Sequence, residues 1–323
     1  MSQSPFQITL GVDIAKLKFD VACLINGKYK HKTFTNDEPG YSVFTAWFIA
    51  LCCDVKPLIC MEATGSYSFP LADFLVSHGH AVSMVNPAKV HAFAKSELSR
   101  AKTDKADAKL IARYALLVQP PLWTPPPANI RELQALVRRA EHLLEMIRME
   151  RNRQDTANSK VIDSIHTVLQ TLEAELEATR KAIHDHINND PDLKHRGDLL
   201  ATIPGIGEAS IAHLLLALSQ HHAFTHAKQV VAFAGLAPAL RQSGQWSGST
   251  HIAKNGDALL RKALYMPALC ALRFNPLIRT FCERLKANGK NGKAIACAAM
   301  RKLIHIAFGV LKSGKPFDPN YAA

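Results

Sequence analysis

Apolar residues in the first 120 positions form short runs separated by polar residues, as they do in proteins built from β-strands. The runs Gln7–Asp13, Phe19–Ile25, Tyr29–Thr35 and Pro57–Met61 each have the length and composition of a strand. The stretch Ala106–Leu117 instead has the composition of a helix. We therefore expect an N-terminal α/β domain in which three strands come first and helices alternate with strands after them.

A long helical region follows. The stretch Ala128–Asp190 contains neither glycine nor proline and is bracketed by prolines. Its apolar residues recur at alternating spacings of three and four, a heptad-like pattern that is typical of long packed helices. Two arrangements fit the pattern: an antiparallel hairpin within the chain, or a coiled coil that joins two protomers. The residues that carry it are Leu133, Leu136, Ala140, Leu143, Ile147, Ile165, Leu169, Leu172, Leu176 and Ile183.

The next segment, Leu199–Ser219, places two apolar helical stretches on either side of Pro204-Gly205-Ile206-Gly207. This pattern is typical of a helix-hairpin-helix, in which glycines let backbone N–H groups approach a phosphate at a helix N-terminus. A plain helical turn that ends at glycine and serves packing within the protein fits the same residues. We expect the remainder of the chain to be mainly helical.

Composition narrows the class of protein. The chain has 323 residues, 48% of them hydrophobic and 20% charged, which suits two or three folded domains. No apolar run approaches the roughly 20 residues that span a bilayer, and the N-terminus lacks a signal-peptide pattern, so we expect a cytoplasmic protein without membrane contact. The seven cysteines form no C-x-x-C pair, and no histidine has a partner at zinc-finger spacing, which argues against a zinc site.

Charge is distributed unevenly along the chain. Between Arg241 and Lys315 there are fourteen Lys or Arg and two acidic residues, so this window alone carries the net charge of +12 of the whole chain. A region this basic indicates a polyanionic partner, most commonly nucleic acid. A solvated surface, or a patch for an acidic protein or a membrane, is the alternative.

Four acidic residues occupy short motifs: GVD, ICMEATGSY and KTDKADAK. Taken singly, each could be a capping or turn residue. Together, the order of elements is that of an RNase H-like sheet whose acids converge at one end. Carboxylates are the ligands that Mg²⁺ prefers, and two such ions can clamp the attacking and leaving oxygens of a phosphodiester. The four residues are Asp13, Glu62, Asp104 and Asp107.

Motifs along nearly the whole chain, from about Leu10 to Asp318, resemble those of the IS110 family of insertion-sequence transposases. They are GVDIAK, MEATGSY, VNPAKVHAFAKS, RAKTDKADA, IPGIGEASI, FAGLAP, RQSG, LRKALYMPA and MRKLIHIAFGVLKSGKPFD. The resemblance implies a RuvC-like metal-dependent catalytic domain in residues 1–122, a coiled-coil segment in 128–190, and a C-terminal transposase domain in 191–323. It also implies that the four acids form the metal site of the first domain.

The resemblance further implies a serine nucleophile in the C-terminal domain, which falls on Ser243 of the RQSG motif; Ser247 and Ser249 lie in the same loop. Family members are expected to use a structured guide RNA, encoded in their own element, that pairs with double-stranded donor and target DNA. In the mechanism we expect, Ser243 attacks a backbone phosphate and forms a phosphoserine, assisted by one or two Mg²⁺ or Mn²⁺ ions. Recombination of two duplexes requires several active sites, so we expect a homodimer or a tetramer.

Two other functions are compatible with the sequence. A hydrolytic RuvC-like nuclease or junction resolvase would use water as the nucleophile and would need only the acids. A non-catalytic nucleic-acid-binding protein would use the acids as helix caps and the basic region for binding.

Overall fold

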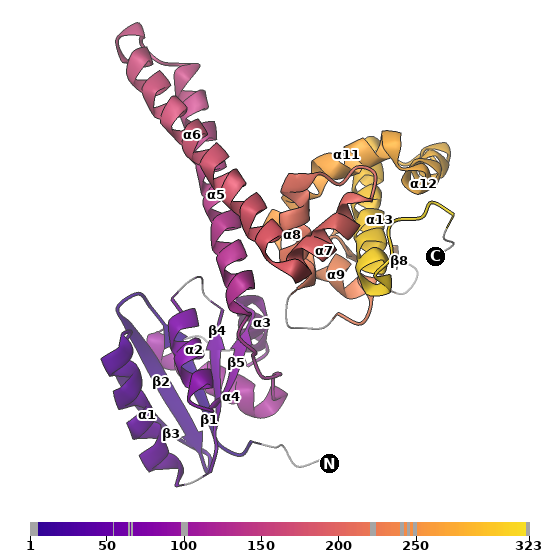
Figure 1. Cartoon of the computed structure of the whole chain (residues 1–323). Helices are drawn as coiled ribbons and strands as arrows, with labels where there is room; N and C mark the ends of the chain where they lie inside the picture. Colours follow the sequence, from indigo (N-terminus) through magenta and orange to yellow (C-terminus); the bar gives the residue numbers. More distant parts are fainter. Residues whose placement is uncertain are drawn as a thin grey trace. The chain divides into compact units, whose positions relative to one another are not determined.

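The computed structural model describes residues 6–53, 55–63, 65, 67–97, 103–219, 224–239, 242–243, 246–247 and 251–320 (Figure 1). At 242–243 and 246–247 it describes the backbone alone. The chain divides into two compact units, residues 1–125 and 126–323. The first is a mixed α/β unit and the second is mainly helical. The three-part division expected from the sequence stays a prediction.

The first unit is built on a five-stranded sheet with the order β3-β2-β1-β4-β5. Strands β1, β2 and β3 form an antiparallel meander, and β4 and β5 run parallel to β1. Each strand expected from the hydrophobic pattern is present, with its ends shifted by one or two residues. The strands are β1 (Thr9–Ile14), β2 (Lys18–Ile25), β3 (Lys28–Thr35), β4 (Leu58–Glu62) and β5 (Ala81–Val85).

Helices cover both faces of this sheet. Helices α1 (Glu38–Cys52) and α2 (Phe69–Ser77) pack on one face, where rings such as Phe19 form an aromatic core with those of α1. Helices α3 (Pro87–Ser96) and α4 (Asp104–Val118) pack on the other. The sequence predicted the helix Ala106–Leu117, which corresponds to α4, and did not predict α3. Proline at the start of α3 and the Asn86 cap before it explain the additional helix.

Helix α4 lies unusually close to the centre of the sheet. Gly11 of β1 allows this approach, because a Cβ there would lie 2.1 Å from the carbonyl oxygen of Ala108 and 2.2 Å from the backbone nitrogen of Ala112. The buried hydroxyl of Thr9 donates a hydrogen bond to the Ala112 carbonyl oxygen at 2.8 Å. Backbone and small side chains therefore fix α4 directly over β1.

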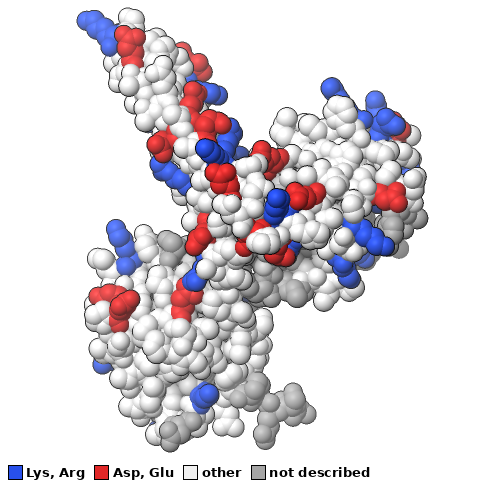
Figure 2. Space-filling view, viewed as in Figure 1, with Lys and Arg blue, Asp and Glu red and all other residues white. Residues whose placement is uncertain are grey.

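The second unit begins with a long antiparallel hairpin of α5 (Ala128–Gln154) and α6 (Ser159–Asn189) (Figure 1). The heptad-like residues meet inside it, and Leu143 and Leu176 are among those buried. Figure 2 shows Lys and Arg interspersed with Asp and Glu along the hairpin surface, as expected for a solvated helix pair. Of the two arrangements that the sequence allowed, the hairpin within the chain is the one formed, and a contact between protomers stays a prediction.

The rest of the unit is a cluster of helices around one apolar core, to which α5 also contributes its first turns. Gly205, in the turn between α7 and α8, has a φ of +104°, and a Cβ there would lie 2.7 Å from the Cβ of Ala271. This glycine therefore serves packing within the protein. The helices are α7 (Pro191–Ala201), α8 (Glu208–Leu218), α9 (Ala227–Phe233), α10 (Ala258–Ala263), α11 (Tyr265–Phe274), α12 (Pro276–Ala287) and α13 (Gly292–Ser313).

A polar network ties the middle of α5 to this core. The mostly buried carboxylate of Glu141 on α5 lies 2.6 Å from Lys262 Nζ on α10 and 3.5 Å from His213 Nε2 on α8. Burial lowers the pKa of His213, and the nearby Glu141 acts in the opposite direction. The network links three helices that are distant in sequence.

Helix α13 departs from one expectation. The sequence suggested no stretch long enough to span a bilayer, but α13 meets the requirement by length and composition. Seven of its residues are buried, and six of them, Leu303 and Ile304 included, belong to the helical core. Core helices of folded domains commonly have this composition.

Candidate catalytic site

Three strand carboxylates lie on one face of the sheet. Side chains alternate between faces along a strand, so Gly11 and Asp13 of β1 share a face. Asp13 pairs directly with Asp20 of β2, and directly paired residues also share a face. On the other side of β1, Gly11 lies opposite Cys60 of β4, which places Glu62 on the same face as Asp13. All three carboxylates therefore lie on the face that α4 covers.

Helix α4 adds two carboxylates to this face. Asp104 and Asp107 both lie in its first turn. The cap of α4 is Thr103, whose hydroxyl accepts a hydrogen bond from the Ala106 N–H at 3.2 Å, so neither acid is the capping residue. Both acids lie near enough to Asp13 to raise its pKa. The structure thus brings together the four acids singled out in the sequence.

Burial and mutual repulsion act on the carboxyl groups at this site. The pKa of Asp13 rises from 3.8 to about 6, mainly because the group is half-buried and secondarily because of Asp107, Asp104 and Asp20. The pKa of Glu62 is also raised, by burial first and then by Asp13 and Asp107. Asp13 and Glu62 are therefore harder to ionise than ordinary carboxyl groups.

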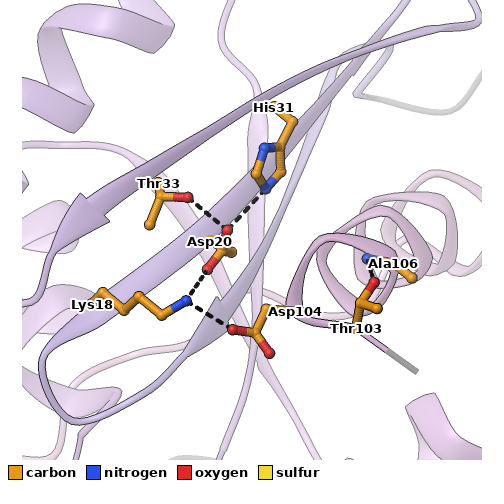
Figure 3. Close-up of polar contacts among 7 residues, drawn as sticks. All are labelled: Lys18, Asp20, His31, Thr33, Thr103, Asp104 and Ala106. Carbon is orange, nitrogen blue, oxygen red and sulfur yellow. Dashed lines mark hydrogen bonds and ion pairs between the residues drawn. The ribbon is translucent and has the colours of Figure 1, made fainter. Parts of the chain in front are cut away.

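Two residues that sequence reasoning missed contribute to the site (Figure 3). Asp20 is 5% exposed, and its side chain faces Lys18, His31 and Thr33. Its Oδ1 accepts a hydrogen bond from the Thr33 hydroxyl at 2.7 Å and lies 2.9 Å from His31 Nε2. The Lys18 ammonium lies 3.4 Å from Asp20 Oδ2 and donates to Asp104 Oδ2 at 2.9 Å. The hydrogen bond from Lys18 lowers the pKa of Asp104, opposite to the shift of Asp13.

A signal for Asp20 is present in the sequence. Asp20 lies between Phe19 and Val21 in a strand, so it must face away from the aromatic core that they build. Its proximity to Asp13 depends on the register of β1 with β2, which a single strand pattern does not determine.

The donor set suits a hard divalent cation. It consists of carboxylate oxygens, the ligands that Mg²⁺ and Mn²⁺ take, and a cation would relieve the repulsion that raises the pKa values of Asp13 and Glu62. Within the described part of the chain, no three His, Cys, Asp or Glu side chains form a group that could hold a metal ion as they stand. One of the four acids, Asp104, is instead bonded to Lys18.

The other candidate, Ser243, belongs to the second unit. Strands β6 (Pro238–Ala239) and β9 (His251–Ile252) pair at the base of its loop. Further along, β7 (Gln242–Ser243) pairs with β8 (Trp246–Ser247). The side chains of these last two strands, and Ser249, lie outside the described residues. The structure therefore places the backbone of Ser243 in a short hairpin.

The basic window of the sequence maps onto this second unit. Among the described residues of the window, Arg261 donates a hydrogen bond to the Ala234 carbonyl oxygen, and Lys262 forms an ion pair with Glu141. The remaining described ones are largely exposed, which suits contact with a polyanion. The exposed members, in addition to Lys262, are Lys254, Arg273, Arg279, Arg284, Lys286, Lys290, Lys293, Lys312 and Lys315.

Comparison with known proteins covers both candidate regions. A family model described as a transposase matches residues 10–157, and the model of the IS116/IS110/IS902 transposase family matches residues 197–283. The pilin gene-inverting protein of Moraxella bovis is 38% identical over 312 residues, which is 96% of this chain and 97% of that protein. The transposase for insertion sequence element IS1328 of Yersinia enterocolitica is 23% identical, over 96% of this chain and 98% of that protein. The four acids lie in the first matched region and Ser243 in the second.

Proposed function

The chain belongs to the IS110 family of transposases, enzymes that act on DNA, and from this premise we propose that it cuts and rejoins DNA through a phosphoserine formed at Ser243. In this proposal the acids of the first unit act together with Ser243 in catalysis. The observation that carries the proposal is the convergence of Asp13, Glu62, Asp104 and Asp107 on the face of the sheet beneath α4.

The first unit is proposed to be a RuvC-like domain. Three antiparallel strands followed by two parallel ones, with a helix that brings acids over the central strand, support this assignment. Asp13, Glu62, Asp104 and Asp107 would hold one or two Mg²⁺ ions, which neutralise charge on phosphoryl and leaving oxygens when bound. The chain's own contribution is to fix carboxylates on a rigid sheet and on a helix that packs closely over Gly11 and is hydrogen-bonded to Thr9.

The chemistry proposed for Ser243 conserves the phosphodiester bond. Its hydroxyl oxygen attacks the phosphorus, one P–O bond of the DNA backbone breaks, and the serine proton ends on the DNA oxygen that leaves. A hydroxyl of another DNA end then attacks the phosphoserine, a new P–O bond to DNA forms, and the serine hydroxyl is restored. Because each cleavage is matched by a ligation, this route favours strand exchange over hydrolysis.

Nucleic-acid contacts are proposed for the helical unit. Its exposed cations would hold DNA backbones and a structured guide RNA encoded by the element, with base pairing choosing the sites. The turn before α8 is proposed to act as a helix-hairpin-helix through Gly207, because no heavy atom lies within 4 Å of a Cβ built there. A homodimer or tetramer would supply the several active sites that recombination of two duplexes needs.

The test is a covalent-adduct assay with the full chain. The protein is mixed with Mg²⁺, labelled donor and target duplexes, and RNA transcribed from the DNA that flanks its gene. We expect the parent protein and Ser247→Ala, which alters the same hairpin, to give a protein–DNA adduct. Ser243→Ala is expected to bind DNA and give no adduct.

The alternatives give different results in the same assay. If the parent cleaves DNA without forming an adduct, and Ser243→Ala cleaves it as well, the protein is a hydrolytic nuclease. If Asp104→Asn recombines DNA at the parental rate, the acids have no catalytic role. Either result would refute the proposal.

A further inference from the structure

Asp20 is a buried carboxylate whose position is fixed from two strands. It belongs to β2, and its oxygen Oδ1 is held by Thr33 and His31 of the neighbouring β3. A carboxylate is costly to bury unless it is hydrogen-bonded, and these partners meet that requirement. Thr33 and His31 both contact Oδ1, and Lys18 contacts the other oxygen, Oδ2.

Lys18 connects this anchor to the acid site. It reaches across from the start of β2 to the first turn of α4, with its ammonium within 4 Å of carboxylate oxygens of both Asp20 and Asp104 (Figure 3). It also lowers the pKa of Asp13, against the effect of the other acids. The ammonium is thus positioned among groups that repel one another.

We propose that Lys18, anchored by Asp20, is a positioning residue that acts as a built-in counter-cation of the acid site: it holds the Asp104 carboxylate when no divalent ion is bound and competes with the ion for it. This inference rests on the proposed function, because it assumes that Asp104 is a metal ligand. It assigns roles to two residues outside the four acids.

The physical reason is charge balance. Acids gathered on one face of a sheet repel one another, and a fixed ammonium among them lowers that repulsion without a metal. The same ammonium and an incoming divalent ion are both cations, so they compete for the Asp104 oxygens. Lys18 therefore stabilises the metal-free protein and weakens its affinity for divalent ions.

The test is metal titration of the full chain, without nucleic acid, after removal of metal with EDTA. Mn²⁺ and Mg²⁺ binding is measured by isothermal titration calorimetry for the parent, Lys18→Met, Lys18→Arg and Lys16→Met. Lys16→Met is the matched control, because Lys16 is an exposed lysine of the same turn with no ion pair among the described residues. Lys18→Met is expected to bind the ions on the order of fivefold more tightly, the upper range for an exposed ion pair. Lys18→Arg and Lys16→Met are expected to stay within about twofold of the parent.

Thermal unfolding separates this role from a merely structural one. Lys18→Met is expected to have a lower Tm than the parent in EDTA, and saturating Mg²⁺ is expected to remove most of the difference, because the ion then supplies the missing charge. A deficit of equal size with and without Mg²⁺ would overturn the inference. Unchanged or weaker metal binding by Lys18→Met would do the same.

The controls keep the two proposals apart. If the parent binds divalent ions and Asp13→Asn abolishes that binding while Lys18→Met leaves it unchanged, the counter-cation inference fails and the metal site stands. If the parent shows no binding that depends on Asp13, the metal site of the proposed function fails, and the inference fails with it.

Discussion

Replacing Asp13 by asparagine is expected to stabilise the first unit while it abolishes recombination. The substitution keeps the shape of the side chain and removes its charge. Asp13 is strained in the ionised form because burial and neighbouring acids oppose it. A site arranged for catalysis at the expense of stability has this property.

The magnitude follows from the pKa. The difference between 3.8 and about 6 corresponds to about 3 kcal/mol. Because the group is only half-buried, solvent screening reduces the effect, and we expect about 1 kcal/mol. In a unit of this size that is a rise in Tm of about 4 °C.

The sign with pH is determined by proton binding. Between about pH 4 and pH 6 the folded protein binds more protons at Asp13 than the unfolded chain does, because its folded pKa is raised. The free energy of unfolding therefore falls as pH rises through this window and is flat above it. In Asp13→Asn this decrease in the free energy of unfolding is expected to be absent, so the variant is expected to be more stable than the parent above about pH 6.

The assay is thermal unfolding in EDTA across pH 4.5 to 7.5, a range chosen around this window. It is followed by tryptophan fluorescence, because Trp47 and Trp123 lie in the first unit. Asp104→Asn is the contrasting control: its pKa is lowered by Lys18, so loss of its charge is expected to reduce stability. If Asp13→Asn is no more stable than the parent at pH 7.5, the reasoning about repulsion is wrong.

Three further substitutions test the packing that supports the site. Gly11→Ala is expected to cost about 3 kcal/mol or more and to abolish activity, because its Cβ would overlap Ala108; a stable, active variant would contradict the close approach of α4. Thr9→Val, which loses one hydrogen bond to α4, is expected to cost about 1 kcal/mol in urea unfolding and to leave a folded enzyme. Glu141→Gln weakens the contact with Lys262 and is expected to lower the free energy of unfolding by about 1–2 kcal/mol. The metal affinity of the first unit is expected to be unchanged; an altered affinity would show that the effect is not local.

Much of the first unit was predictable from periodicity, because strands and helices bury apolar residues at characteristic spacings. The composition of Ala106–Leu117 also predicted a helix, and the observed helix begins two residues earlier, with Asp104 and Asp107 in its first turn. Strand register was not predictable, since it depends on contacts between segments, and Asp20 was missed for that reason. Helix α3 was missed because its sequence has a weak apolar pattern and only Val90 is buried.

For the second unit, long packed helices followed from the heptad-like pattern, but the pattern did not choose between a partner helix within the chain and one in another protomer. Composition located the basic region correctly. It did not show that Arg261 and Lys262 bond to other groups of the protein, because those bonds depend on the tertiary positions of Ala234 and Glu141. A count of charged residues therefore includes cations that already have partners within the protein.

The positions of the acids depend on a feature that is visible in the sequence but whose meaning needs the fold. A glycine in the middle of a buried strand destabilises it unless another backbone passes close by. Gly11 meets Ala108 and Ala112, so three small residues from two distant segments determine how near α4 comes to β1. Any larger side chain at this crossing would move α4 outward and carry Asp104 and Asp107 away from the strand carboxylates. The geometry of the acid site is therefore determined as much by the residues that lack side-chain bulk as by those that carry charge.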